Sequence, residues 1–211
     1  MARRLLLALV LALGLFGVLA ALQPLRAAEA ETHHFWFKSQ FAEAFFSNLD
    51  ETGCVVTDAF VAAVDGRSKE AGTPEVSSQA FLFISRFDQC TGTQLLAAEG
   101  FPILTEREFQ IDHRLTTATL ETTIEVFDYV SGTSFPVDVS VSWEGSGDRV
   151  RISDHFQVKA PGFKLNARFD GTFRTAQASG PISDGTTDFT PDPAVFANMS
   201  SVKQGELVVT H

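Results

Sequence analysis

Strict alternation between apolar and polar residues is the feature that most constrains the fold of this chain. A period of two puts successive side chains on opposite faces of a β-strand, whereas a helix needs a period near 3.6. Turn residues separate the alternating segments, so the pattern predicts a meander of antiparallel strands, each with one apolar face. The alternation runs through residues 118–126, 137–143, 150–158 and 165–173, with turns expected at 145–148 and 161–162.

The earlier part of the chain fits the same class. Phe35, Phe37, Phe41 and Phe45 suit alternation, although the last three also recur at helical spacing. Aromatic enrichment favours a strand there. Residues 54–64 alternate cleanly, and residues 80–88 are apolar on both faces, as expected of a central strand. We expect polar loops at 65–77 and over most of 177–202, and one helical turn at 194–198.

A turn motif occurs twice, forty residues apart. Phe87-Asp88-x-x-Thr91-Gly92-Thr93 is echoed by Phe127-Asp128-x-x-Ser131-Gly132-Thr133. Aspartate can accept hydrogen bonds from turn amides, and glycine supplies the positive φ that short connections need. We therefore expect two equivalent hairpins, over residues 80–98 and 118–143.

Residues 1–30 have the form of a secretory signal peptide. Arg3 and Arg4 precede an unbroken apolar run at 5–22, and Ala28-Glu29-Ala30 offers a cleavage site. The run is also long enough to span a bilayer, so an uncleaved N-terminal anchor is the alternative. We expect a secreted or extracytoplasmic chain whose single domain covers residues 31–211, with no further membrane span.

The exported chain is acidic. Removing residues 1–30 takes away three arginines and one glutamate, which leaves 13 basic and 25 acidic side chains. That balance argues against nucleic acid or an anionic membrane as partner of the protein as a whole. The 20 phenylalanines have no polar tip, so most are expected in the core. No cofactor motif is found; the oligomeric state and the extracellular ligand or surface stay open.

The two cysteines are predicted to form one disulfide, Cys54–Cys90, because exported chains are oxidised. If 54–64 pairs with 80–88 so that the cysteines lie opposite one another, Asp58 faces Arg86. A partly buried carboxylate–guanidinium pair can mark a functional site, but more often fixes the register.

A stripe of cations is expected on the hairpin formed by residues 149–174. One interpretation is a binding surface for a polyanion; the other is a ladder of cross-strand ion pairs, which we favour. The ladder would place Glu144 opposite Arg149, Asp138 opposite His155 and Arg151 opposite Asp170. The stripe comprises Arg149, Arg151, Lys159, Lys164, Arg168 and Arg174.

Cleavage after Ala30 would create a second candidate site. A new terminus Glu31-Thr32-His33 offers an amine, two amides and an imidazole, the planar nitrogen set that Cu(II) and Ni(II) prefer. A frayed terminus is the plainer expectation.

Together these patterns predict an all-β, antiparallel β-sandwich, immunoglobulin-like or jelly-roll-like, with about eight to ten strands and one disulfide. We find no catalytic motif. The function expected from sequence is a secreted, non-enzymatic β-sandwich with a binding or envelope-structural role. An extracytoplasmic enzyme or inhibitor, with a site assembled from distant loops, is the alternative.

Overall fold

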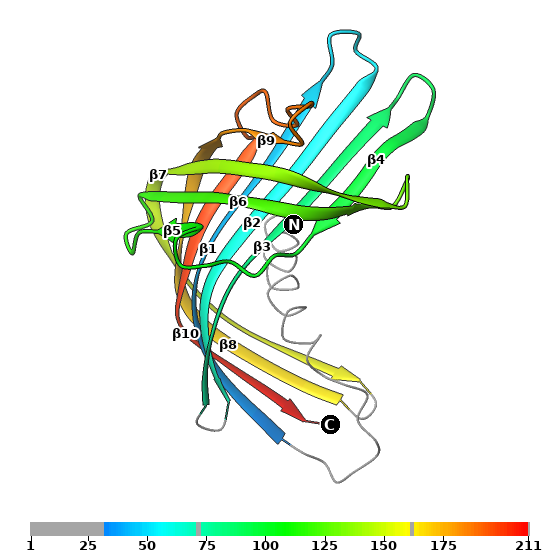
Figure 1. The fold of residues 1–211 in the computed structure, drawn as a ribbon. Helices are drawn as coiled ribbons and strands as arrows, with labels where there is room; N and C mark the ends of the chain where they lie inside the picture. Colours follow the sequence, from blue (N-terminus) through cyan, green and yellow to red (C-terminus); the bar gives the residue numbers. More distant parts are fainter. Residues whose placement is uncertain (1–31, 71–72, 161–162, 211) are drawn as a thin grey trace.

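The strands that the structure describes pair antiparallel in one sheet (Figure 1). The computed structural model describes residues 32–70, 73–160 and 163–210, and it contains no helix in these ranges, hence none that could span a membrane. The predicted signal peptide, residues 1–30, lies outside the described residues. The strands are β1 (Thr32–Leu49), β2 (Val55–Glu70), β3 (Thr73–Asp88), β4 (Thr93–Gly100), β5 (Phe109–Ile111), β6 (Thr117–Asp128), β7 (Thr133–Ala160), β8 (Phe163–Ser179), β9 (Ile182–Ser183) and β10 (Phe196–Thr210).

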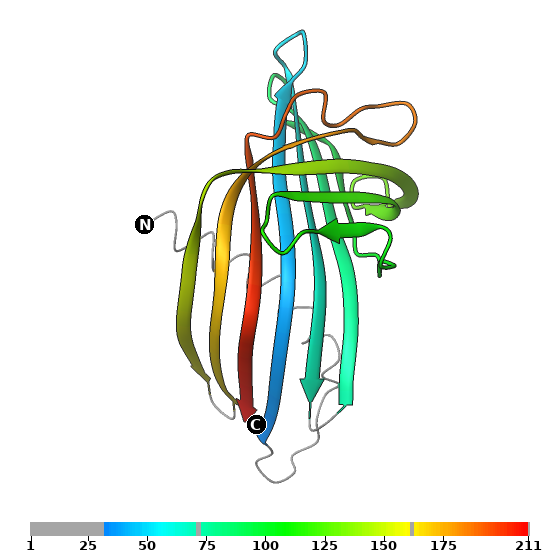
Figure 2. The same ribbon diagram turned by 90° about the vertical axis from the view of Figure 1, so that its left-hand side faces the viewer.

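The sheet closes on itself at one end. Its order is β5-β6-β4-β3-β2-β1-β10-β8-β7-β9, and an additional β6–β7 pairing joins the two sides. The hairpin of β6 and the first half of β7, here the crossing hairpin, passes over the other strands in Figure 2. The all-β antiparallel prediction is confirmed. The predicted sandwich is not, because the described strands form one sheet and not two.

The main core fills the space between the sheet and the crossing hairpin. We call the sheet face toward this hairpin the crossing face. Trp143, Leu120 and Ile124 of the hairpin are fully buried against small residues such as Ala42 and Ala44 of β1. Small side chains suit this closed half, because strands facing one another across a narrow interior leave little room for two bulky layers.

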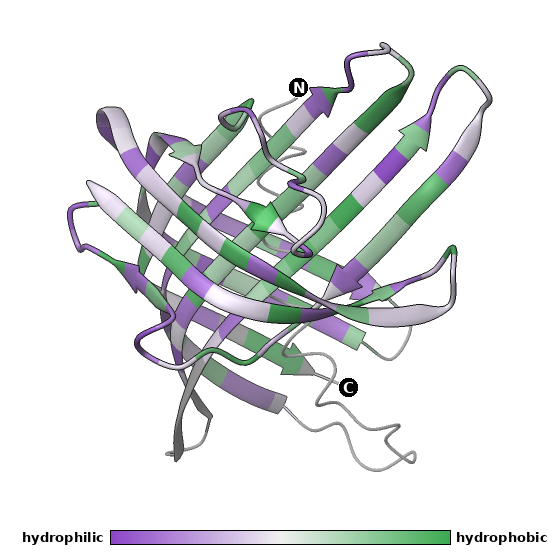
Figure 3. Ribbon diagram, turned by 45° about the horizontal axis from the view of Figure 1, so that its top comes forward, coloured by the Kyte–Doolittle hydropathy of each residue, from purple (hydrophilic) through white to green (hydrophobic). Residues whose placement is uncertain are grey.

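Beyond the crossing hairpin, the long strands continue as an open half-sheet in the order β3-β2-β1-β10-β8-β7. In this open half the polarity of the faces is reversed. On β1, Ala42, Ala44 and Phe46 are buried on the crossing face, whereas the even residues from Thr32 to Lys38 are exposed. Figure 3 shows hydrophilic and hydrophobic residues alternating along these strands.

The reversal explains why the predicted turn at 145–148 is wrong. β7 runs without interruption through these residues, with only an irregular register between Ser146 and Val150. Apolar residues occupy odd positions before this point and even positions after it. The sequence pattern of two strands pointing into one core therefore comes from one strand that presents apolar residues first on one face and then on the other.

Most of the predicted loop at 65–77 and part of the predicted helical turn at 194–198 belong to strands, whereas the predicted loop within 177–202 is confirmed for 184–195. β2 and β3 extend through most of 65–77, because Asp65 pairs with Ser78 and Glu70 with Thr73. β10 begins at Phe196 inside the predicted helical turn. The polar residues in these segments favoured a loop in the sequence analysis, but in the structure they belong to strands, because one face of the open half is polar.

The repeated turns are confirmed as equivalent. Asp88 Oδ1 accepts hydrogen bonds from the amides of Cys90 and Thr91, at 2.9 and 3.0 Å. Asp128 accepts from Val130 and Ser131 in the same way. Gly92 and Gly132 have φ of 71° and 72°, the left-handed conformation that the motif predicted.

β10 contains a one-residue bulge. From Val202 to Gln204 of β10 the partner on β8 advances by only one residue, from Gly171 to Asp170, and the pairing with β1 shifts correspondingly between Phe37 and Ser39. Before the bulge the odd residues of β10, such as Met199, point toward the main core. After the bulge the odd residues, such as Val209, lie on the other face of the sheet.

Candidate functional site

Phenylalanine side chains gather on the sheet face that points away from the crossing hairpin. Paired residues of neighbouring strands share a face. The register therefore puts Phe45, Phe60 and Phe83 side by side across β1, β2 and β3. We call this surface the phenylalanine face; its phenylalanines are Phe35, Phe37, Phe41, Phe45, Phe60, Phe81, Phe83, Phe87, Phe156, Phe163, Phe169, Phe173 and Phe196.

No described strand crosses the phenylalanine face, and most of its phenylalanines are half-buried. Leu165, Ala167 and Val209 form a small buried cluster on it, against Phe35 and other aromatic rings. The long strands bend along their length, and the crossing hairpin lies on the outer side of the bend (Figures 1 and 2). The phenylalanine face is therefore the inner, concave side.

Close approach of the backbone shapes this face at one point. A Cβ at Gly205 would lie 2.2 Å from Cζ of Phe37, so the aromatic ring rests directly on the glycine. Phe37 and Gly205 are register partners on β1 and β10. The missing side chain is what lets the ring lie flat on the sheet.

A buried acid interrupts the apolar surface. Glu43 lies on the phenylalanine face between Phe41 and Phe45, is 1% exposed, and accepts a hydrogen bond from Asn198 Nδ2 at 2.5 Å. Burial raises the pKa of the Glu43 carboxyl to about 7, although the bond from Asn198 acts in the opposite direction. At neutral pH this carboxyl is poised between its charged and neutral forms.

Exposed cations occupy the crossing face of the open half. Lys38 of β1 pairs with Arg67 of β2, and Lys159 of β7 pairs with Lys164 of β8. Arg151 and Arg168 lie on the same face, where His155 opposes Arg168. We call this surface the basic face; its cations are Lys38, Arg67, Arg151, Lys159, Lys164 and Arg168, all exposed.

The favoured ladder of ion pairs is wrong. Glu144 and Arg149 lie on one continuous strand, as do Asp138 and His155, so neither pair can face across a hairpin. The connection between β7 and β8 is shorter than expected, because Ala160 pairs with Phe163. Asp170 is consequently opposite Ser153 and not opposite Arg151.

Arg174 is set apart from the other cations of the predicted stripe. Its Nε donates to the carbonyl of Gly147 at 3.1 Å and its Nη1 to the carbonyl of Leu115 at 3.3 Å. These bonds hold the bend of β7 against the loop before β6. Arg149 is exposed at the irregular part of β7.

An exposed tryptophan lies among the cations. Trp36 precedes Lys38 by two residues on the same face and is 43% exposed. It stacks on His34 with 6.0 Å between ring centroids, and His34 is 3.8 Å from Glu206. Nearby, Arg168, Ser153, Asp154 and His155 line a shallow hollow of about 470 Å³.

The predicted ion pair between Asp58 and Arg86 is wrong by one residue. Asp58 pairs with Ser85 and Thr57 with Arg86, so the two charges lie on opposite faces. The disulfide joins residues just beyond the last ladder pair, Val55 with Asp88, and Gln89 takes up the extra position. The cysteines therefore do not define the register.

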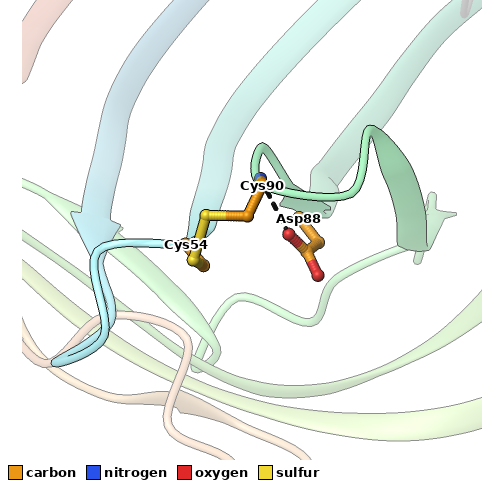
Figure 4. A group of neighbouring side chains, drawn as sticks. All are labelled: Cys54, Asp88 and Cys90. Carbon is orange, nitrogen blue, oxygen red and sulfur yellow. Dashed lines mark hydrogen bonds between the residues drawn. A yellow bond between two sulfur atoms is a disulfide. The ribbon is translucent and has the colours of Figure 1, made fainter.

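The predicted disulfide itself is present. Cys54 and Cys90 are bonded, with their Cα atoms 5.3 Å apart, at the end of the β2–β3 pair (Figure 4). Asp88 lies beside them and bonds the amide of Cys90. Sulfurs bonded to each other are not thiolates, so this cluster does not offer a metal the ligands that its residue types suggest.

His33 stands in β1, opposite Val209, with its ring 6.3 Å from that of Phe35. The copper or nickel site predicted there depends on a terminus at Glu31, which lies outside the described residues. It stays a prediction.

Sequence reasoning missed Glu43, Trp36 and the phenylalanine face. The signal for the face was present: apolar residues of β1 occupy odd positions through Phe45 but also even positions from Ala42. Such an overlap of two phases indicates a strand whose two faces are apolar over different lengths. Glu43, between Ala42 and Ala44, was the polar residue inside that overlap.

Comparison with known proteins gives no family. No family model and no curated protein matches the chain. Among solved structures, an acetoacetate decarboxylase-like enzyme from Sphingomonas wittichii RW1 is found with a TM-score of 0.29 and 11% identity, over 90% of this chain and 94% of that one. A likeness at this level carries no argument about the activity of this chain.

The function expected from sequence is corrected in its structural premise. It assumed a β-sandwich, and this is contradicted because the described strands form one sheet and not two.

Proposed function

We propose that the phenylalanine face binds the acyl chain of a lipid. The observation that carries the proposal is the concentration of phenylalanines from β1, β2, β3, β7 and β8 on one concave face that no described strand covers. A contiguous apolar surface of this kind marks an interaction site, because exposing it to water is unfavourable in proportion to its area.

The shape of the face suits a long chain. From Phe35 to Phe45 it follows β1 for ten residue steps, about 33 Å at 3.3 Å per residue, which accommodates an extended acyl chain. Phenylalanine contributes large apolar area without a polar tip that would need a partner. The buried polar pair, Glu43 and Asn198, is satisfied by its own hydrogen bond and does not demand a polar ligand.

Two other occupants would come from the protein itself. The apolar segment 5–22 could lie on the face, but the sequence predicts its removal on export. A second copy would have to cover a concave surface with an identical concave surface, which gives poor complementarity. A flexible chain fits such a surface better than either.

The test is a titration of the exported protein, its N-terminus determined by sequencing, with a fluorescent polyene fatty acid. We expect saturable binding with enhanced emission. Phe35→Ser and Phe163→Ser, which remove half-buried rings far from the main core, should each weaken binding about tenfold, corresponding to about 1.4 kcal/mol of lost apolar contact.

Phe127→Ser is the matched control. Phe127 is 43% exposed on β6, on the outside of the crossing hairpin, and should leave the affinity unchanged. Absence of binding by the wild type, or equal affinity of all three variants, would overturn the proposal. The proposal would also be overturned if a chain that retains segment 5–22 bound the fatty acid only after that segment was cleaved away. The phenylalanine face would then be the binding site of segment 5–22 and not of a lipid.

A further inference from the structure

We infer that the basic face is a second binding site, and that its ligand is an anionic polysaccharide. The inference goes beyond the lipid-binding proposal and does not depend on it, because the basic face lies on the opposite side of the open half-sheet.

The first argument is the placement of like charges. Lys38 faces Arg67 directly, and Lys159 faces Lys164, each across one step of the sheet. Like charges opposite one another on neighbouring strands destabilise a sheet. In the part of the chain that the structure describes, none of the six cations of the basic face makes an ion pair with a carboxylate. An anionic ligand would supply the missing counter-charge.

The second argument is the dimension of the site. The cations extend from β2 through β1, β10 and β8 to β7, four strand spacings or about 19 Å. Among the described residues, three carboxylates share this face: Asp65 accepts from Ser78, Glu206 lies near His34, and Asp170 lies opposite Ser153. The six cations therefore outnumber the carboxylates of the face. A ligand with repeated negative charges matches this strip better than a single small anion does.

The third argument distinguishes a chain from a flat surface. The outside of the adjacent crossing hairpin carries the exposed acids Glu121, Glu125, Asp138 and Glu144. An anionic membrane approaching this side would meet these carboxylates as well as the cations. A polysaccharide can follow the basic strip alone, and at physiological salt the screening length of about 8 Å reduces repulsion from the rest of the acidic protein.

Trp36 adds a reason to expect sugar. Its indole is exposed between the cations of β2 and those of β8, so the apolar face of a sugar ring can stack on it while Lys38 and Arg168 hold the charged groups.

The experiment measures binding of heparin, a sulfated polysaccharide, to the exported protein by calorimetry at several salt concentrations. We expect affinity that falls as salt rises, no binding of neutral dextran, and at least a fivefold loss for Lys38→Glu or Arg168→Glu. Trp36→Ala should lower the affinity but leave the salt dependence unchanged, because no charge is removed.

Arg107→Glu is the matched control: it makes the same charge change at an exposed residue of the turn before β5, and should alter binding less than twofold. An equal loss with Arg107→Glu would show a net-charge effect and overturn the inference. So would vesicles of anionic lipid that bind through the same cations while heparin does not bind. Phe35→Ser should bind heparin normally, so failure here and failure of the lipid proposal are distinguishable.

Discussion

Replacing Glu43 by glutamine should remove a pH dependence from the stability of the protein. Glutamine has the size of the protonated acid and can keep the contact with Asn198, but it cannot ionise. The pKa of Glu43 is raised by burial from 4.5 to about 7 in the folded chain. A raised folded pKa means that the folded state holds its proton more tightly than the unfolded state does.

The sign and size follow from that difference. Below pH 4.5 the carboxyl is protonated in both states and the fold keeps its full stability. Between pH 4.5 and about 7 only the unfolded chain releases the proton, so stability falls with rising pH. A difference of this size corresponds to about 3 kcal/mol, all of it lost above pH 7. Glu43→Gln should thus match the wild type near pH 4 and exceed its free energy of unfolding by up to about 3 kcal/mol at pH 8.

Urea unfolding followed by circular dichroism, repeated from pH 4 to pH 8, measures this directly. Other groups, including the aspartates whose pKa is lowered by hydrogen bonds from turn amides, titrate alike in both proteins, so their contributions cancel in the difference. Glu121→Gln, at an exposed site on β6, should show no such gain. A difference between wild type and Glu43→Gln that does not change with pH would refute the reasoning.

Three further changes probe the framework. Replacing Cys54 and Cys90 by serine should lower the free energy of unfolding by up to about 4 kcal/mol, the chain entropy of the loop that the disulfide closes, seen as a lower urea midpoint. Gly205→Ala should cost about 1–3 kcal/mol and weaken fatty-acid binding, because the new methyl group displaces the aromatic ring above it; unchanged thermal unfolding would contradict this. Asp128→Ala should destabilise more than Asp88→Ala, since Asp128 is 4% exposed and also bonds the amide of Ala97 on β4, whereas Asp88 serves only its own turn; equal melting temperatures would contradict this order.

The class of the fold could be predicted from sequence because alternation is a local property. Each long run, such as 118–126, needs only its own residues to indicate a strand. The repeated turns were predictable for the same reason, since Asp128, Ser131 and Gly132 bond within a few residues of one another. The disulfide could be predicted because the chain has two cysteines and its N-terminal residues predict export.

The arrangement of the strands could not be predicted, because it depends on which core each apolar phase faces. A change of phase near Gly145 is compatible with a hairpin returning to the same core or with one strand serving two environments. Choosing between them requires knowledge of the partner strands. The predicted ion pairs were wrong for the same reason. The placement of Asp170 opposite Arg151 depends on the length of the turn between β7 and β8, and an error of two residues in that length was enough to misplace Asp170.

Because of the bulge, the number of residues in β10 is constrained as strictly as the identity of its side chains. Insertions and deletions are usually tolerated in loops, where backbone is free to adjust. Here the single additional residue near Lys203 sets which side of the sheet Val209 and its neighbours occupy. Descendants of this chain can therefore exchange side chains on both surfaces independently. A lost codon at this point would instead reverse the faces of β10 after the bulge, so that Leu207 and Val209 would face the cations and Glu206 would face the phenylalanines.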